Sequence, residues 1–195
     1  MQNKSLLFLT EIAIFSALAL LLDYISGVLS LQIWAQGGSI SLTMIPIMLI
    51  AFRWGLKGGL TVGLITGILQ IFITSPHITS PLQGALDYPL AFASIGLAGI
   101  FASQIRRAAK NGNKKSLTAY LIIGAFIGSF ARYICHVTSG IVYFASYAPE
   151  EMNATLYSFI YNASYMLPSF VLTAVLLATL FVTRTQLLKS PTVNV

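Results

Sequence analysis

Long apolar runs fill this chain, and so few charges interrupt them that the runs decide what it can fold into. Lys, Arg, Asp and Glu make up 8% of the 195 residues, whereas 56% are hydrophobic. A soluble domain carries about 25% charged residues, because water must solvate its surface. At roughly 20 residues per crossing, the length allows five or six membrane helices and no soluble catalytic domain. The sequence therefore predicts an all-α integral membrane protein with one domain, residues 1–195.

Six apolar segments follow one another along the chain, and each is expected to form a helix. They cover residues 5–29, 41–52, 58–73, 82–104, 117–146 and 153–184. The first begins like a signal peptide, but Glu11 interrupts its apolar run and no clear cleavage site follows, so we expect it to be retained. The second contains Pro46 and is too short alone to cross squarely. In the third, Gly59, Gly63 and Gly67 recur every four residues, which predicts close packing against another helix.

The basic residues mark one side of the membrane. With six crossings, all but one of the 11 lysines and arginines fall on the side that holds both chain ends, and five of these lie in a polar linker, residues 106–116. The loops on the other side, residues 30–40, 74–80 and 147–152, contain neither lysine nor arginine. Because positive residues concentrate in cytoplasmic loops, both termini are predicted to be cytoplasmic. This distribution also explains the net charge of +6 without a nucleic-acid partner.

Polar residues collect in the outer halves of the fifth and sixth helices, between residues 132 and 162. Polar groups at membrane depth are costly and by default suggest a site. The residues Arg132, His136, Gly140 and Tyr143 are spaced so that they lie near one face of a helix, and Phe144 adjoins them. With Tyr157 and Asn162 of the next helix, they predict a pocket that opens to the outside.

The residue types in this pocket favour a small, planar, cationic ligand with polar edges. A negative charge would come from Asp87, and flat faces would come from Trp34, Tyr88, Phe144 and Tyr157. Directional donors and acceptors would come from His136 and Asn162, and Gly140 would leave room for a ring near the backbone.

Structural explanations exist for the same residues. The carboxylate of Asp87 can cap a helix or neutralise Arg132 in a structural pair. Tyrosines near a membrane interface often only anchor the protein there, and His136 can bond to a neighbouring helix. These alternatives stay open on the residues alone.

Several chemistries have no sequence signal in this chain. It contains no G-x-x-x-x-G-K-[ST], H-E-x-x-H or G-x-S-x-G pattern. Its two histidines cannot form a usual catalytic zinc site alone, and its single cysteine, Cys135, excludes an internal disulfide. We therefore expect neither an enzyme nor a bound cofactor, but a small binding subunit that works with other chains.

The chain resembles the thiamine-specific S component (ThiT type) of bacterial energy-coupling-factor vitamin transporters over nearly its whole length. The resemblance rests first on R-Y-I-C-H-x3-G-x3-F, which starts at Arg132, and on Y-x4-N after the S-Y-A-P turn. It rests further on L-D-Y at residues 86–88, on Trp34 in the first outer loop, and on the A-x-x-x-A strip formed by Ala13 and Ala17 of the first helix.

The resemblance implies a role for each of these residues. Trp34 and His136 would contact thiamine, with Trp34 on a loop that acts as a lid. The position of Asp87, where the family commonly has Glu, would face the positively charged thiazolium ring. The aminopyrimidine ring would be held by Tyr157 and Asn162. The remaining positions are a backbone contact at Gly140, a stacking position at Phe144 where Trp is familiar, and the hydroxyethyl end at Tyr88 and Arg132.

The resemblance also implies partners and a location. The protein would lie in the bacterial plasma membrane, capture thiamine from outside and associate through Ala13 and Ala17 with a transmembrane coupling subunit and two cytoplasmic ATPases. Toppling of the whole protein in the membrane would then deliver the vitamin inward. The alternatives are an S component for a riboflavin-like or pyridoxine-like ring, an autonomous small transporter, and an intramembrane enzyme.

Overall fold

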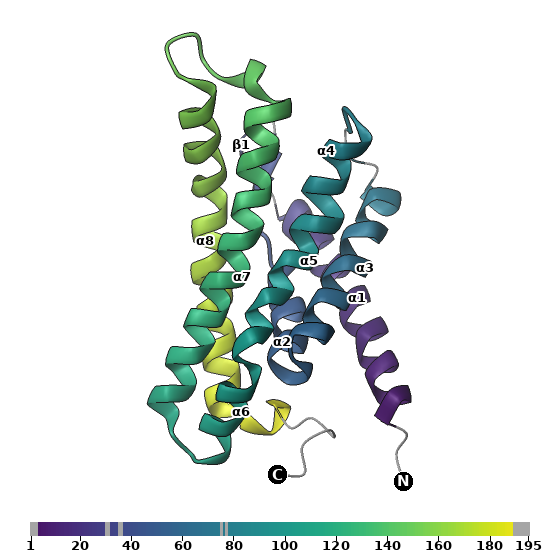
Figure 1. Ribbon diagram of the computed structural model, residues 1–195, viewed down its shortest axis with the longest axis vertical. Coiled ribbons are helices and arrows are strands. Elements are labelled where there is room, and N and C mark those ends of the chain that lie inside the picture. The colour runs from purple at the N-terminus through teal and green to yellow at the C-terminus, as the bar shows by residue number, and fades with distance from the viewer. Residues whose placement is uncertain (1–3, 30–31, 35–36, 75, 77, 189–195) are drawn as a thin grey trace.

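The chain forms a bundle of membrane helices, seen in a computed structural model that describes residues 4–29, 32–34, 37–74, 76 and 78–188 (Figure 1). Five helical segments are long and apolar enough to cross a membrane: α1 (Lys4–Val28), α3 (Leu56–Thr74), the segment Pro81–Lys110, α7 (Lys114–Tyr143) and α8 (Ala154–Thr183). The short apolar helix α2 (Met44–Trp54) is the sixth. The all-α architecture predicted from the sequence is confirmed.

The short helix α2 lies at the centre of the bundle. Its residues Met44, Ile47, Met48, Ala51 and Phe52 are all 0% exposed. A helix that is apolar on every side must be covered on every side, and α1, α3, α7 and α8 surround it. At about 1.5 Å per residue its 11 residues are too short to cross a bilayer alone, as predicted.

The fourth segment is an irregular helix. It consists of α4 (Pro81–Ala85), the π-helical turn η1 (Leu86–Leu90) around Pro89, α5 (Ala91–Ile95), the 3₁₀ stretch η2 (Gly96–Phe101) and α6 (Ala102–Lys110). Helix α6 continues into the sequence expected to be a polar linker, so the connection to α7 is only residues 111–113. The basic residues there lie on helix ends rather than on an extended loop.

Close packing of α3 against this irregular segment explains the three regularly spaced glycines. A Cβ on Gly59 would lie 2.8 Å from the Cα of Gly96, and a Cβ on Gly67 would lie 2.5 Å from the carbonyl oxygen of Tyr88. A Cβ on Gly63 would collide with the carbonyl of Phe92. Backbone meets backbone along the whole strip, which confirms the predicted role of these glycines.

The first outer loop contains a small hairpin that the sequence did not indicate. Strand β1 (Gln32–Trp34) pairs antiparallel with β2 (Gly37–Ser39), with Gln32 opposite Ser39. A Cβ on Gly38, whose φ is +72°, would lie 2.7 Å from the ring of Tyr165 on α8. The second strand therefore lies directly against the outer half of α8.

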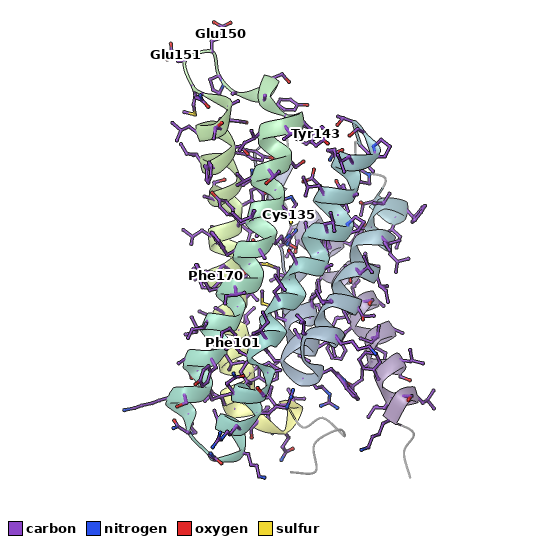
Figure 2. All side chains as sticks on the ribbon, viewed as in Figure 1. Phe101, Cys135, Tyr143, Glu150, Glu151 and Phe170 are labelled. Atoms are coloured by element: carbon purple, nitrogen blue, oxygen red, sulfur yellow. The ribbon has the colours of Figure 1, made fainter. Side chains whose placement is uncertain are left out.

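Both ends of the described chain lie at one end of the bundle, as an even number of crossings requires (Figure 1). At this end, the guanidinium of Arg53 connects α2 to α1 and to the 3₁₀ turn η4 (Thr185–Leu188). It pairs with Glu11 of α1 through two hydrogen bonds of 2.7 Å and donates to the carbonyl of Leu187 in η4. The opposite end carries Glu150 and Glu151, which project from the exposed turn between α7 and α8 (Figure 2). By the positive-inside rule, the end with the termini is cytoplasmic.

Candidate functional site

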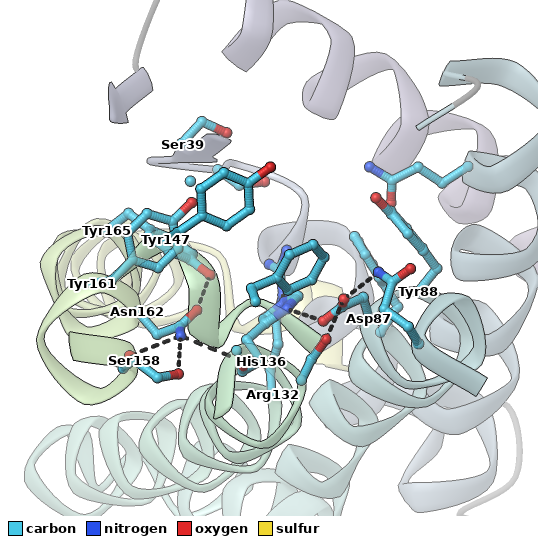
Figure 3. A pocket seen from close by; sticks show the side chains of 18 of the residues that line it. Ser39, Asp87, Tyr88, Arg132, His136, Tyr147, Ser158, Tyr161, Asn162 and Tyr165 are labelled. Atoms are coloured by element: carbon cyan, nitrogen blue, oxygen red, sulfur yellow. Dashed lines mark hydrogen bonds and ion pairs between the residues drawn. The ribbon is translucent and has the colours of Figure 1, made fainter. Parts of the chain in front are cut away.

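One large cavity opens in the outer half of the bundle, with a volume of about 510 Å³ (Figure 3). Ligand sites in proteins typically have about 300–1,000 Å³. Eight of the nine predicted ligand residues line it: Asp87, Tyr88, Arg132, His136, Gly140, Phe144, Tyr157 and Asn162. The ninth, Trp34, has its backbone in β1, and its side chain lies outside the described parts of the chain. His77 of the second outer loop lies outside them as well.

The carboxylate of Asp87 is held by three donors from two helical segments. The amide of Gln83 on α4 and the hydroxyl of Ser139 on α7 each donate to Oδ2 at 2.6 Å, and His136 Nδ1 lies 3.1 Å from Oδ1. The side chain that caps α4 is Ser80, which accepts from the backbone N–H of Gln83. Asp87 is therefore a cavity residue in the π-helical turn and not the helix cap.

A hydrogen-bonded relay connects Asp87 to Arg132 through His136. The Nε–H of Arg132 donates to His136 Nε2 at 3.2 Å. Because a guanidinium has no acceptor, Nε2 must be unprotonated, so Nδ1 carries the proton and donates it to Asp87. The imidazole is thus neutral, and it separates the two charges. Among the described residues, Asp87 and Arg132 form no direct ion pair.

The guanidinium of Arg132 is itself only partly satisfied. The side chain is 7% exposed, and its Cζ lies 4.5 Å from the ring centroid of Phe92. Its Nη1 has no hydrogen-bond partner among the described residues. A buried donor without a partner is costly, which favours a site that is completed by a bound molecule.

Aromatic side chains of α8 form one wall of the cavity (Figure 3). The rings of Tyr157 and Tyr161 are stacked with centroids 5.7 Å apart, and Tyr161 meets Tyr165 edge to face at 5.7 Å. Of these three tyrosines, only Tyr157 was predicted from the sequence to line the cavity. The four-residue spacing of all three tyrosines was the signal that places them on one face.

Two predicted residues contribute differently from what was expected. A Cβ on Gly140 would collide with the hydroxyl of Ser158, so the missing side chain allows α7 and α8 to approach closely rather than leaving an empty space. The amide of Asn162 donates to the Ser158 carbonyl at 2.8 Å and accepts from the Tyr165 hydroxyl at 2.5 Å. This amide has a fixed orientation before any ligand arrives. Tyr143, expected on the same face as His136, does not line the cavity.

The acid Asp23 lines the cavity from α1 and was not among the residues predicted from the sequence. Its Oδ2 accepts a 2.6 Å hydrogen bond from Gln70 of α3, and its Oδ1 accepts one of 2.8 Å from Thr43 and a longer one of 3.4 Å from Ser41. The sequence did contain a signal for Asp23: an acid at the end of an apolar membrane segment needs polar partners, which indicates a polar site nearby.

Helix α1 has its predicted small residues on an exposed face. Ala13 and Ala17 are exposed, whereas Ile12, Ser16 and Ala19 face the bundle and are buried. In the part of the chain that the structure describes, no three histidine, cysteine or acidic side chains gather as a metal site would require.

Comparisons with known proteins agree with this architecture. Residues 9–189 match the family model described as "Thiamine transporter protein (Thia_YuaJ)". The chain belongs to this thiamine transporter family.

Two named relatives and one solved structure of the thiamine transporter family cover almost all of the chain. "Thiamine transporter ThiT" of Bacillus subtilis (strain 168) is 50% identical over 190 residues, which are 97% of this chain and 97% of that protein. "Thiamine transporter ThiT" of Lacticaseibacillus paracasei (strain ATCC 334) is 34% identical over 192 residues, covering 95% and 92%. A structure of ThiT from Listeria monocytogenes superposes with a TM-score of 0.88 at 32% identity, covering 95% of this chain and 99% of that one.

Membership in the thiamine transporter family settles the broad class of the protein. These relatives carry the names of transporters rather than enzymes, which agrees with the absence of catalytic motifs. With five membrane-length helices, the chain is a multi-pass protein of the plasma membrane.

Proposed function

We propose that this protein is a high-affinity thiamine-binding S component of an energy-coupling-factor importer. The observation that carries the proposal is the position of Asp87 on an aromatic-lined cavity, in a chain that belongs to the thiamine transporter family. Thiamine is a flat molecule with a positively charged thiazolium ring, an aminopyrimidine ring and a hydroxyethyl group. It needs an anion, stacking faces and directional hydrogen bonds, and the cavity offers all three.

In this proposal each part of thiamine meets a group of matching chemistry. The thiazolium ring lies toward the Asp87 carboxylate, which its three donors hold in one orientation. The aminopyrimidine ring lies among Phe144, Tyr157 and Asn162, with Trp34 on the hairpin as the covering residue. Since both nitrogens of His136 already have protein partners, its ring face is what remains for the ligand. The hydroxyethyl group lies toward Tyr88 and toward Arg132, whose Nη1 has no hydrogen-bond partner within the described parts of the chain.

Delivery into the cell is proposed to depend on partner chains. The exposed face of α1, with Ala13 and Ala17 between the exposed side chains of Ile14 and Leu18, offers a surface where another helix can approach closely. We assign this face to a transmembrane coupling subunit that works with two cytoplasmic ATPases. The loaded protein then topples in the membrane and releases thiamine inward.

Calorimetric titration of the detergent-purified protein tests the ligand. We expect submicromolar affinity for thiamine and no heat of binding for riboflavin or pyridoxine. Fluorescence gives a second readout, because the chain has two tryptophans, and Trp54 is bonded to Glu11 at the cytoplasmic end. Thiamine should quench the Trp54→Phe variant as strongly as the wild type and should not quench the Trp34→Phe variant. A response to another vitamin in place of thiamine would reject the assignment.

Reconstitution tests the dependence on partners. Liposomes that contain this chain alone should bind thiamine but should not accumulate it. Uptake by the chain without partners would show an autonomous transporter and would reject the S-component role.

A further inference from the structure

The charged residues around the cavity do not cancel. Those described are Asp23, Asp87 and Arg132, and the hydrogen bonds of His136 make its imidazole neutral. The cavity therefore has one net negative charge. The unit charges of Asp87 and Arg132 sum to zero, although Asp87 still acts on a cationic ring that lies directly beside it. The net charge of the cavity therefore depends on Asp23.

Neutral donors surround the carboxylate of Asp23. Its partners are the amide of Gln70 and the hydroxyls of Thr43 and Ser41, and all of these are neutral donors. Among the described residues, no lysine, arginine or histidine lies within ion-pair distance of it. The carboxylate of Asp23 thus has neutral donors and no cationic partner among the described residues, and it places a negative charge on the wall made by α1 and α3.

An unsatisfied acceptor lies beside this anion. Gln70 is 9% exposed and lines the cavity, and its Nε2 is committed to Asp23. Its Oε1 has no hydrogen-bond partner among the described residues. A buried carbonyl oxygen without a donor is costly and fits a site that a ligand completes. This wall is therefore built for contact with a ligand and does more than fill space between helices.

We propose that Asp23 is a second ligand-facing acid of this site, and that its charge makes the cavity select a monocation over a neutral molecule of the same shape. The proposal rests on the proposed function, since thiamine is the monocation in question. A bound thiamine brings the total charge of ligand and cavity to zero. A neutral analogue leaves the half-buried anion of Asp23 uncompensated, which a site partly shielded from water penalises.

A purely structural role for Asp23 has a different signature. Its hydrogen bonds also tie α1 to α3 and to the start of α2, so a loss of these ties would weaken the binding of every ligand alike. Thr43→Val is the matched control, because it removes a 2.8 Å hydrogen bond to the same carboxylate and leaves the charge. The informative quantity is the ratio of two affinities, for thiamine and for its neutral thiophene isostere, in which carbon replaces the quaternary nitrogen.

The experiment measures both affinities by calorimetry on purified wild type, Asp23→Asn and Thr43→Val. We expect Asp23→Asn to weaken thiamine binding about tenfold, which is ~1.4 kcal/mol, and to change isostere binding less than about twofold. The ratio should stay at its wild-type value in Thr43→Val. If Asp23→Asn does not yield folded protein, Asp23→Ser replaces it with another small neutral group, and the same ratio decides.

A rescue variant makes the test specific for charge. Ser41 lines the cavity, and its hydroxyl lies 3.4 Å from Asp23 Oδ1. The double variant Asp23→Asn, Ser41→Asp therefore returns a carboxylate to the cavity at this neighbouring position. It should restore the preference for the cation. An equal loss for both ligands in Asp23→Asn, or a double variant without preference, overturns the role of Asp23. No binding of thiamine to the wild type overturns the proposed function, and the inference with it.

Discussion

Asp87→Asn is the substitution whose consequence the site geometry defines best. The carboxylate accepts from Gln83 and Ser139 on one oxygen and faces His136 Nδ1 with the other. If the side-chain oxygen of the Asn accepts from Gln83 and Ser139, its NH2 group faces the N–H of His136. Turning the imidazole to the other tautomer moves the conflict to Arg132, whose Nε–H then meets Nε2–H. One buried donor is left without an acceptor in either arrangement.

The magnitude follows from two contributions. An unsatisfied buried donor costs about 1–3 kcal/mol, and this cost falls on the empty protein as well as on the complex. The contribution specific to binding is the lost attraction between the carboxylate and the thiazolium ring. For unit charges about 5 Å apart at an effective dielectric constant of about 20, this attraction is roughly 3 kcal/mol. We therefore expect Asp87→Asn to weaken thiamine binding about a hundredfold.

Calorimetry with a matched variant gives the assay. Ser139→Ala removes one 2.6 Å hydrogen bond to Asp87 but keeps its charge, so it should weaken thiamine binding less than about tenfold. Tyr147→Phe also changes a cavity residue, one that is 50% exposed, and should have a smaller effect still. Similar losses in all three variants would mean that Asp87 acts as a structural acceptor, and the proposed contact with the cationic ring would have to be abandoned.

Three further substitutions test the fold and the surface. Gly63→Val should destabilise the protein by about 1–3 kcal/mol, because its side chain would overlap the backbone of the neighbouring helix. Gly27→Ala is the control and should not destabilise it, since no atom lies within 4 Å of its Cβ. Thermal unfolding of the purified variants measures both effects. Glu11→Gln breaks the two-bond pair with Arg53 and should cost about 2–3 kcal/mol in the same assay, with thiamine affinity unchanged. Ala17→Phe should keep thiamine affinity but abolish uptake in cells; loss of binding, or normal uptake, would contradict the docking face.

The sequence was sufficient for the architecture because the membrane restricts it so strongly. Backbone groups in lipid must be satisfied within a helix, so an apolar run of membrane length has one possible form. The 106–116 segment shows where this reasoning fails. Its basic composition suggested a loop, but helix α6 reaches Lys110 because Asn111 and Gly112 provide the turn, and charged side chains tolerate a helix end in water. The hairpin escaped prediction because each strand has only three residues.

The candidate site was predictable where motifs marked it and unpredictable where contacts between helices define it. The spacing of Arg132, His136 and Gly140 placed them on one wall. The relay from Asp87 through His136 depends on how the irregular fourth segment, with Asp87 in its π-helical turn, aligns with α7. A residue pattern within one helix does not determine the register between two helices.

The two acids of α1 show that the role of a charged residue in a membrane helix depends on the groups to which it is bonded. Lipid gives helices little hydrophobic reason to associate, so polar bonds and small residues hold them together. Helix α1 is exposed over much of its length, and both of its acids bond to other elements: Glu11 to Arg53, and Asp23 to Thr43 and Gln70. These acids are 12 residues apart, about 18 Å along the helix. The charge of Glu11 is neutralised by Arg53, so the role of Glu11 is only to hold α1 against α2. Asp23 accepts hydrogen bonds from neutral groups and lines the cavity, so the same residue can hold the helix in place and act on a cation.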